Sequence, residues 1–484
     1  MRILLVQPGW GQGMGFHQLS LAEPLALETL AGGLVGHDVR LLDLRVDNRL
    51  LQTLKEFRPQ LVGIHCSFTI DVYKVQRIAA TAKETMGSER PFVIVGGHHA
   101  TLNPGDFACS AVDAVAIGEG EITMAELVGS LEAGRGPEKV AGLALNTPEG
   151  QVFTDPRPMV DDMDSLPQPN RELTRRYWDS YYLFNYRHMA VVETTRGCPY
   201  RCHFCAVWCF YKGTVRYRTP ERVVDEVLKI REPNVLFCDD NFLADPERAE
   251  RIALLLRERG SQHHYLFQAR TDSVAAHPDL LRLWKSIGLD GVFLGMEKIS
   301  DTGLEGINKN NSAANNEAAV QILGSMELAA MGSFIVDPDW DHADFQALRD
   351  YVETRHIYSP SFSVLTPLPG TVLYRRVRKQ LLTDNYDMYD LLHAILPTKM
   401  PLYEFYQEFS WLFKSGYRPG RLTVETLRVI RSGVWLEPGG ISHLRQIGLA
   451  AFRLADPESY LLAHRQDQHF AGLVPAPASE RTAS

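Results

Sequence analysis

The feature that most constrains the fold is a regular alternation of short apolar runs with amphipathic segments, which occurs twice along the chain. In the first series the runs are ILLV, DVRLLDL, LVGIHCS, PFVIVGG and AVDAVAIGEGE, and a helix is expected around residues 24–34. Strands that alternate with helices form a parallel, doubly wound sheet, which binds ligands beyond the carboxyl ends of its strands. Small residues at these ends, such as Gly9, let a large flat ligand approach the backbone.

The second series follows a stretch rich in Pro and Asp, residues 146–169, whose composition is typical of a linker. Its runs are MAVVETT, NVLFCDD, YLFQART, GVFLGME, GSFIVD and FSVLTPLPGT. Six such units predict an open, partial barrel related to the eight-unit barrel, with its site at the carboxyl ends of the strands.

The predicted fold class is therefore α/β, with a Rossmann-like doubly wound domain, a partial (β/α)6 barrel and a C-terminal helical region. The predicted boundaries are 1–145 for the first domain, 146–185 for the linker, 186–400 for the barrel, 401–470 for the helices and 471–484 for a disordered tail.

Length, charge and hydropathy exclude several classes of function. At 484 residues and 45% hydrophobic composition, the chain is too long for one compact core. A formal net charge of -9 leaves no basic excess for a polyanion, so nucleic acid is not expected as a partner. No stretch approaches the roughly 20 apolar residues of a membrane helix, and MRILLVQPGW suits a buried strand better than a secretory signal. We expect a cytoplasmic protein with no transmembrane segment.

Three of the seven cysteines, Cys198, Cys202 and Cys205, form a C-x3-C-x2-C motif directly after a predicted strand and the turn at Gly197. Three thiolates in one short loop can ligate three irons of a four-iron four-sulfur cube and leave the fourth iron open. An open iron at a barrel mouth can chelate S-adenosylmethionine and pass it one electron, which gives a carbon radical. The motif therefore predicts an iron–sulfur centre for radical chemistry.

The alternative for such a loop is structural zinc, which takes four ligands in paired C-x2-C spacing. The nearby fourth thiol, Cys209, is expected on a following loop. We interpret Cys209 as an ordinary small apolar residue, and His203 as a spacer within the motif. The same interpretation applies to Cys66, Cys109 and Cys238.

The motif is that of the radical S-adenosylmethionine superfamily, and the resemblance covers most of the chain. FCDDNFLADPERAERI, GLDGVFLGMEKIS, LEGINKNN and TPLPGT resemble barrel segments of the cobalamin-binding branch of that superfamily. IVGGHHATLNP and DAVAIGEGE resemble the last two strand ends of its cobalamin domain. The resemblance implies three cofactors: a four-iron four-sulfur cluster, S-adenosylmethionine and cobalamin.

Within this branch the resemblance is strongest to the hopanoid C-3 methylases. It rests on FIVDPDWDHADF, on TPLPGT and on LLTDNYDMYDLLHAILPTKMPLYEFYQE. The spacing of six residues in these segments is similar to theirs: Asp337, Asp339, Trp340, His393, Pro397 and Phe405. Bacteriochlorophyll side-chain methylases and antibiotic C-methyltransferases share the chemistry but not the substrate.

The resemblance also assigns residues to cofactors. Cys198, Cys202 and Cys205 would bind the cluster, and Phe204 would pack near the adenine of S-adenosylmethionine. Glu297 would accept hydrogen bonds from its ribose or amino group. The cobalamin edge would be lined by Ser67, Gly96, Gly97, Gly118 and Glu119. Gly295 would let S-adenosylmethionine approach the backbone.

The sequence leaves two points open: the axial ligand of cobalt and the identity of any catalytic residue. The D-x-H-x-x-G motif that supplies a histidine to cobalt in methionine-synthase-type domains is absent, because the corresponding loop is QPGWGQGMGFHQL. No Ser-His-Asp set or pair of carboxylates suggests a catalytic residue, which suits chemistry dominated by positioning.

The resemblance implies methylation of an unactivated carbon. The substrate would be a small molecule or lipid, either a hopanoid or a natural-product precursor, and an external flavodoxin or ferredoxin would supply electrons. An oxidative cyclase or ring-remodelling enzyme with the same cofactors is the alternative within enzymes. A cobalamin-binding sensor without turnover is the alternative from another class, although a sensor needs no reducible cluster.

Overall fold

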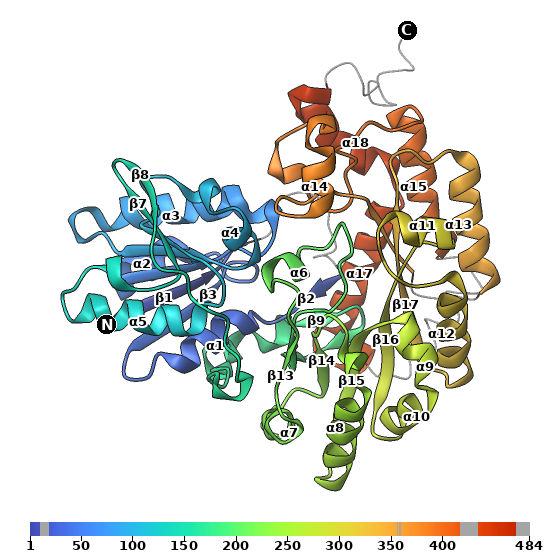
Figure 1. Ribbon diagram of the computed structural model, residues 1–484, viewed down its shortest axis with the longest axis horizontal. Helices are drawn as coiled ribbons and strands as arrows, with labels where there is room; N and C mark the ends of the chain where they lie inside the picture. Colours follow the sequence, from blue (N-terminus) through green and yellow to red (C-terminus); the bar gives the residue numbers. More distant parts are fainter. Residues whose placement is uncertain (10–18, 356, 358–359, 417–433, 471–484) are drawn as a thin grey trace.

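The computed structural model describes residues 1–9, 19–355, 357, 360–416 and 434–470. The tail 471–484, which was predicted to be disordered, lies outside the described residues. Figure 1 shows two α/β parts side by side, with the N-terminal part in blue and cyan and the barrel in green, yellow and orange.

The N-terminal part is built on a seven-stranded sheet of order β3-β1-β4-β5-β6-β7-β8. The first five strands in this order run parallel to one another. Their bounds are β1 (Arg2–Gln7), β3 (Asp38–Asp43), β4 (Leu61–His65), β5 (Phe92–Gly96) and β6 (Ala114–Ala116). The helices between them are α1 (Leu25–Gly33), α2 (Leu50–Phe57), α3 (Val72–Met86), α4 (His98–Leu102) and α5 (Gly120–Glu132).

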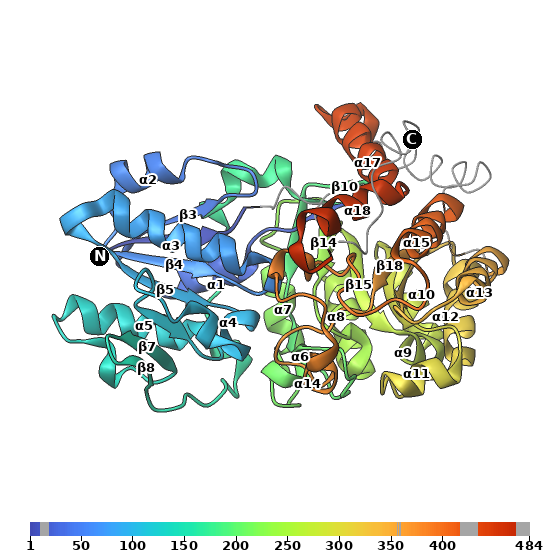
Figure 2. The same cartoon turned by 90° about the horizontal axis from the view of Figure 1, so that it is seen from above.

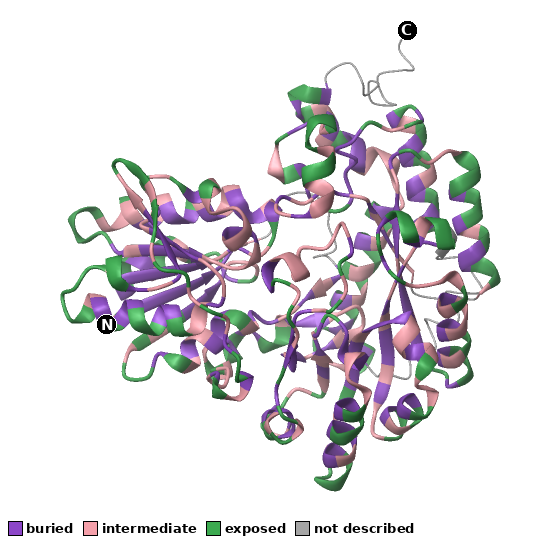
Figure 3. Ribbon diagram, in the orientation of Figure 1, coloured by how far each residue is buried: buried purple, intermediate pink, exposed green. Residues whose placement is uncertain are grey.

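Both faces of this sheet are covered, as a doubly wound fold requires. In β1, Leu4 and Val6 pack with residues of α2 and α3, because alternate side chains of a strand point to one face. Ile3 and Leu5 point the other way and pack with residues of α1 and α5. Figure 3 shows the strands buried between exposed helix faces. The predicted doubly wound domain is confirmed.

An antiparallel hairpin at the edge of this sheet was not predicted. It consists of β7 (Leu143–Thr147) and β8 (Gly150–Phe153), and β7 pairs with β6. The hairpin spans the predicted boundary at residue 145, and β8 lies within the stretch interpreted as a linker. Because β8 is largely exposed and short, it lacks the apolar run that marks a buried strand.

The second part contains six parallel strands in the order β11-β14-β15-β16-β17-β18, which confirms the partial barrel. Each strand pairs in parallel with the next, and the register shifts once between β15 and β16 and once between β16 and β17. The bounds are β11 (Met189–Val192), β14 (Asn234–Phe237), β15 (His264–Arg270), β16 (Leu289–Glu297), β17 (Ala329–Val336) and β18 (Ser361–Val364).

Helices cover the outside of this sheet, and a small apolar cluster fills the base of its concave face. The covering helices are α7 (Pro220–Val227), α8 (Pro246–Glu258), α10 (Pro278–Ser286), α12 (Ala313–Ser325) and α13 (His342–Thr354). The basal cluster contains Met189, Leu266 and Met331, packed against Leu236 and Phe293. The concave face is therefore apolar at its base.

The C-terminal helical region is also present, with α15 (Leu402–Gly416), α17 (Gly440–Leu454) and α18 (Pro457–Gln466). Phe405 and Phe409 of α15 are fully buried and belong to the core, whereas Trp411 of the same helix is 49% exposed. Among the helices of the described residues, none is long and apolar enough to cross a membrane.

This region contains a buried histidine whose titration predicts a pH dependence of stability. His464 in α18 is fully buried, its Nε2 lies 2.8 Å from the Tyr406 hydroxyl, and burial lowers its pKa to about 2. Below pH 6.5 the unfolded chain takes up a proton that the folded chain cannot bind. Stability is therefore lost as the pH falls, by at most about 1.4 kcal/mol per pH unit for this group.

We expect the thermal unfolding midpoint of the wild type to fall between pH 7 and pH 5, and that of His464→Gln to fall less. Scanning calorimetry of both proteins at the two pH values checks this. Equal losses in the two proteins would contradict it.

Candidate functional site

The cysteine loop lies at the carboxyl end of β11, between the short strand β12 (Thr195–Arg196) and helix α6 (Val207–Phe210). Hydrogen bonds hold it in place: His203 N donates to Ile307 O at 2.9 Å, and Leu373 N donates to His203 O at 2.8 Å. The Trp208 indole donates to Cys202 O at 2.9 Å. Segments that follow β16 and β18 therefore fix the backbone of the motif. Cys209, expected on a loop, lies in α6.

The three thiols are suited to a metal cluster. None of the seven cysteines forms a disulfide, and Cys202 is buried while Cys198 and Cys205 are partly buried. Burial raises the pKa of all three thiols, and that of Cys205 to about 12. Thiolates in such surroundings need a bound metal to compensate their charge. The donor set fits an iron–sulfur cluster, with soft ligands in one loop.

Among the described residues, no group of three or more His, Cys, Asp or Glu side chains is arranged to hold a metal ion. This finding is compatible with a cluster site, because the thiolates that bind a four-iron four-sulfur cube each bind a different iron and do not converge on a single ion.

Glu297 ends β16 at the same edge of the barrel and has a left-handed backbone, with φ of 63°. A non-glycine residue in this region is uncommon and often marks a functional position. Its carboxylate is 2.9 Å from the ammonium group of Lys309, which is 6% exposed. A Cβ on Gly295 would lie 2.9 Å from both Glu297 Oε1 and Lys309 Nζ. Glycine at 295 therefore leaves room for this ion pair.

The neighbouring strand contributes Arg270, which forms an ion pair with Asp272 at 2.9 Å. Its guanidinium also stacks on the ring of Tyr200 at 3.5 Å and donates to Lys309 O. Arg270 thus joins the cysteine loop to the segment that carries Lys309. Phe204, between Cys202 and Cys205, is half-buried.

The predicted cobalamin residues gather at the carboxyl edge of the first sheet. The Ser67 hydroxyl lies 2.7 Å from His65 Nε2, and His65 Nδ1 lies 2.8 Å from the Gln7 side chain. Gly97 follows Gly96 with φ of 122°, and a Cβ there would lie 2.6 Å from Cys66 O, so only glycine fits. A Cβ on Gly118 would instead meet open space, because no atom beyond the chain neighbours lies within 4 Å of its position. The edge can therefore admit a flat ligand at Gly118.

Glu119 has a different environment from the glycines beside it. Its carboxylate is buried and pairs with Arg196 and Arg216, each at 2.8 Å, and it accepts from Val160 N. Desolvation by burial raises the pKa of Glu119, but the hydrogen bond from Arg216 and the interactions with Arg196 and Val160 N outweigh it. The pKa of Glu119 is therefore lowered. Glu119 therefore connects the first sheet to the cysteine loop, and its direct contact with a cofactor stays a prediction.

The two edges face each other. The His98 ring of α4, next to Gly97, packs on Phe210 of α6 with ring centroids 4.2 Å apart. Figure 1 shows α4 and α6 next to each other between the two parts of the molecule. The structure thus brings the predicted cobalamin edge beside the cysteine loop, although these residues are about a hundred positions apart in sequence.

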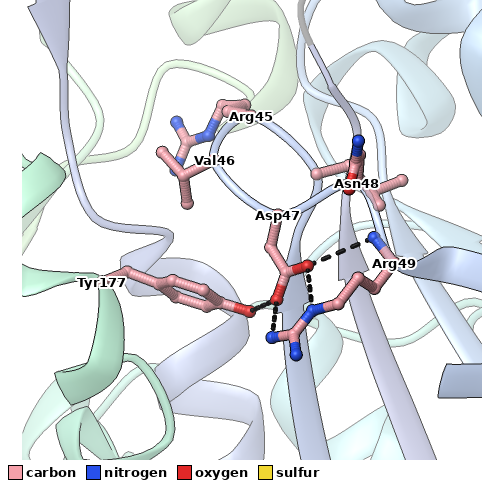
Figure 4. Close-up of a pocket in the computed structure, with 7 residues that line it drawn as sticks. Arg45, Val46, Asp47, Asn48, Arg49 and Tyr177 are labelled. Carbon is pink, nitrogen blue, oxygen red and sulfur yellow. Dashed lines mark hydrogen bonds and ion pairs between the residues drawn. The ribbon is translucent and has the colours of Figure 1, made fainter. Parts of the chain in front are cut away.

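A separate surface pocket of about 520 Å³ lies at the carboxyl end of β3. Figure 4 shows the Asp47 carboxylate accepting from Arg49 and from the Tyr177 hydroxyl, both at 2.8 Å. These bonds hold the pKa of Asp47 well below its usual range. The charges of Asp47 and Arg49 thus compensate each other within the pocket.

Sequence reasoning missed Lys309, Arg196 and Arg216. Lys309 lies in the quoted segment LEGINKNN and Arg196 directly follows MAVVETT, but nothing local marks them as partners of carboxylates. Their roles depend on contacts between distant segments.

Comparison with known proteins gives the following matches. A model of the radical SAM superfamily matches residues 192–352, and a model of the B12 binding domain matches residues 19–128. The chain is 32% identical to the hopanoid C-3 methylase of Methylococcus capsulatus over 95% of this chain and 89% of that protein. It is 27% identical to the anaerobic magnesium-protoporphyrin IX monomethyl ester cyclase of Cereibacter sphaeroides, over 82% of this chain and 67% of that protein.

Among solved structures, the fold resembles the radical S-adenosylmethionine methyltransferase TsrM from Kitasatospora setae. The TM-score is 0.62 at 20% identity, covering 78% of this chain and 76% of that one. The fold of this chain, with its two α/β parts, therefore resembles one already seen in a solved structure.

Proposed function

Because this chain belongs to the family of cobalamin-dependent radical S-adenosylmethionine methyltransferases, we propose that it methylates an unactivated carbon of a polycyclic, hopanoid-like lipid. The observation that carries this proposal is the 32% identity to a hopanoid C-3 methylase along 95% of the chain. The cofactors of the family are a four-iron four-sulfur cluster, S-adenosylmethionine and cobalamin, which together supply a carbon radical and a transferable methyl group.

The residues of the site support this assignment of roles. We propose that Cys198, Cys202 and Cys205 bind the cluster through their thiolates. Glu297, held by Lys309, accepts hydrogen bonds from S-adenosylmethionine, with Gly295 and Phe204 beside it. The edge formed by Ser67, Gly96, Gly97 and Gly118 holds cobalamin, and Glu119 positions that edge through its arginine partners.

Two observations support an apolar substrate. Met189, Leu266 and Met331 form a buried apolar cluster at the base of the concave barrel face. The segment that carries the resemblance to hopanoid methylases lies beside β18, where Val364 N donates to Leu391 O at 2.7 Å. An apolar floor excludes water around a lipid but offers few partners to a heteroaromatic acid.

We further propose that the electron comes from an external flavodoxin or ferredoxin in the cytoplasm, where reducing conditions keep the cysteines free for the cluster.

The proposal is tested with S-adenosylmethionine carrying a deuterated methyl group. The protein is rebuilt anaerobically with iron, sulfide and cobalamin, reduced, and incubated with hopanoids and, separately, with heteroaromatic acids. Mass spectrometry is expected to find the labelled methyl group in a hopanoid product. A modified product without the label would instead favour the cyclase alternative. Label found only in the heteroaromatic acids would mean that such an acid, and not a lipid, is the substrate.

The role of Glu297 makes a further prediction. Glu297→Gln keeps the shape of the side chain but removes its charge, and a hydrogen bond to a charged group contributes about 1.5–3 kcal/mol. We expect the KM for S-adenosylmethionine, measured by release of 5′-deoxyadenosine on reduction, to rise roughly tenfold or more.

The matched control is Glu305→Gln, since Glu305 is exposed in helix α11 (Asp301–Gly306) a few residues away. Its KM should equal that of the wild type. An unchanged KM in Glu297→Gln would remove Glu297 from the binding site.

A further inference from the structure

Helix α17 and the turn before it present an apolar surface to solvent, which we call the α17 face. The exposed fractions are 70% for Leu436, 72% for Ile441, 53% for Leu449 and 75% for Phe452. Ile441, Leu449 and Phe452 lie on one side of the helix, because positions eight and eleven residues apart fall close together around a helix axis. Figure 2 shows α17 at the outer edge of the molecule.

The opposite side of α17 attaches the helix to the barrel. His443 is 7% exposed, its Nε2 lies 2.7 Å from Phe184 O, and its ring packs on that of Tyr182 at 4.5 Å. Ala450 and Leu454 are buried on the same side. Among the described residues, folding therefore uses one apolar side of the helix and leaves the α17 face uncovered. An exposed apolar patch of this kind marks an interaction site.

The charge of the α17 face is positive, although the whole chain has a net charge of -9. Arg445 lies within the apolar stripe and Arg453 beside it, and both are exposed. The helix contains no Asp or Glu. The acidic residue of the preceding turn, Glu437, lies 3.4 Å from Arg187 and from His188, so its charge is compensated away from the helix.

The exposed apolar side chains and the positive charge of the α17 face together indicate which kind of partner it binds. A second copy of the chain docking symmetrically would bring the same patch against itself and so place arginines opposite arginines, with no carboxylate on α17 between them. An anionic bilayer instead accepts apolar side chains below its headgroups and arginines among them. Trp435, 43% exposed at the start of the face, is a residue type enriched at that boundary.

We propose that the α17 face docks the protein onto the surface of an anionic lipid membrane. The inference rests on exposure and charge and is independent of the proposed substrate.

The test is co-sedimentation of the full-length protein with vesicles of phosphatidylcholine mixed with phosphatidylglycerol, compared with pure phosphatidylcholine. The wild type is expected to bind the anionic vesicles more tightly, with binding weakened by added salt. Arg445→Gln combined with Arg453→Gln should weaken that binding by about tenfold or more. Ile441→Ser combined with Phe452→Ser should abolish it, and circular dichroism should remain unchanged because these side chains are exposed.

The matched control is Phe153→Ser, which removes an aromatic side chain that is 60% exposed on β8. It should bind as the wild type does. The proposal is overturned if the wild type fails to bind anionic vesicles, or if Phe153→Ser loses as much binding as the combined Ile441→Ser and Phe452→Ser variant. It is also overturned if light scattering shows a dimer that the combined Ile441→Ser and Phe452→Ser variant converts to a monomer.

Discussion

Replacing Cys202 by alanine is expected to abolish both assembly of the iron–sulfur cluster and methyl transfer. Cys202 is the central and most buried thiol of the motif. Two remaining thiolates cannot hold a cube whose fourth corner must stay open for S-adenosylmethionine. After anaerobic reconstitution, the variant should lack the visible absorbance and the electron paramagnetic resonance signal of a reduced cluster, and release of 5′-deoxyadenosine should fall below detection.

Cys209→Ala is the control for this experiment, because Cys209 lies only four residues beyond Cys205 and is also partly buried. It should contain the same iron and sulfide as the wild type and keep its activity. If Cys209→Ala lost the cluster while Cys202→Ala kept it, the ligand assignment would be wrong. If the reconstituted wild type held zinc and no iron, the assignment of radical chemistry to this protein would also be wrong.

The sequence predicted most of the fold because buried parallel strands leave long apolar runs. Each run quoted for the two sheets contains all or part of an observed strand, from β1 to β18. The hairpin of β7 and β8 was missed because β8 has only four residues, most of them exposed, in a segment rich in turn-forming residues. A strand at a sheet edge needs no apolar run on either face, so periodicity carries little information about it.

For the site, local motifs were predictable and long-range partners were not. The cysteine spacing is a property of one loop, and so it can be recognised without any knowledge of tertiary structure. The pairing of Glu297 with Lys309 depends on the path of the chain after β16, and the pairing of Arg196 with Glu119 joins residues 77 positions apart. Such pairs leave no periodic pattern in the sequence. Residues 10–18, which make up most of the segment QPGWGQGMGFHQL, lie outside the described residues.

The pairing at Arg196 has a large expected effect. Its guanidinium is 8% exposed and bonds three carboxylates: Glu119 at 2.8 Å, Glu121 at 2.6 Å and Glu193 at 2.8 Å. Glu119 and Glu121 belong to the first sheet's edge, whereas Arg196 directly precedes the cysteine loop. Arg196→Met keeps much of the bulk but leaves buried carboxylates without their partner, which costs roughly 3–5 kcal/mol. We expect a thermal unfolding midpoint lower by several degrees, together with weaker cobalamin binding in spectroscopic titration.

The two controls for Arg196→Met separate charge from bulk. Arg251→Met removes an arginine whose pair with Glu221 is 3.1 Å long and more than half exposed on both sides, so it should change the midpoint little. Adding Glu121→Gln to Arg196→Met should recover part of the loss, because it neutralises a carboxylate whose buried Oε2 has no hydrogen-bond partner among the described residues. If the double variant were no more stable than Arg196→Met, packing of the arginine side chain and not its charge would connect the two parts.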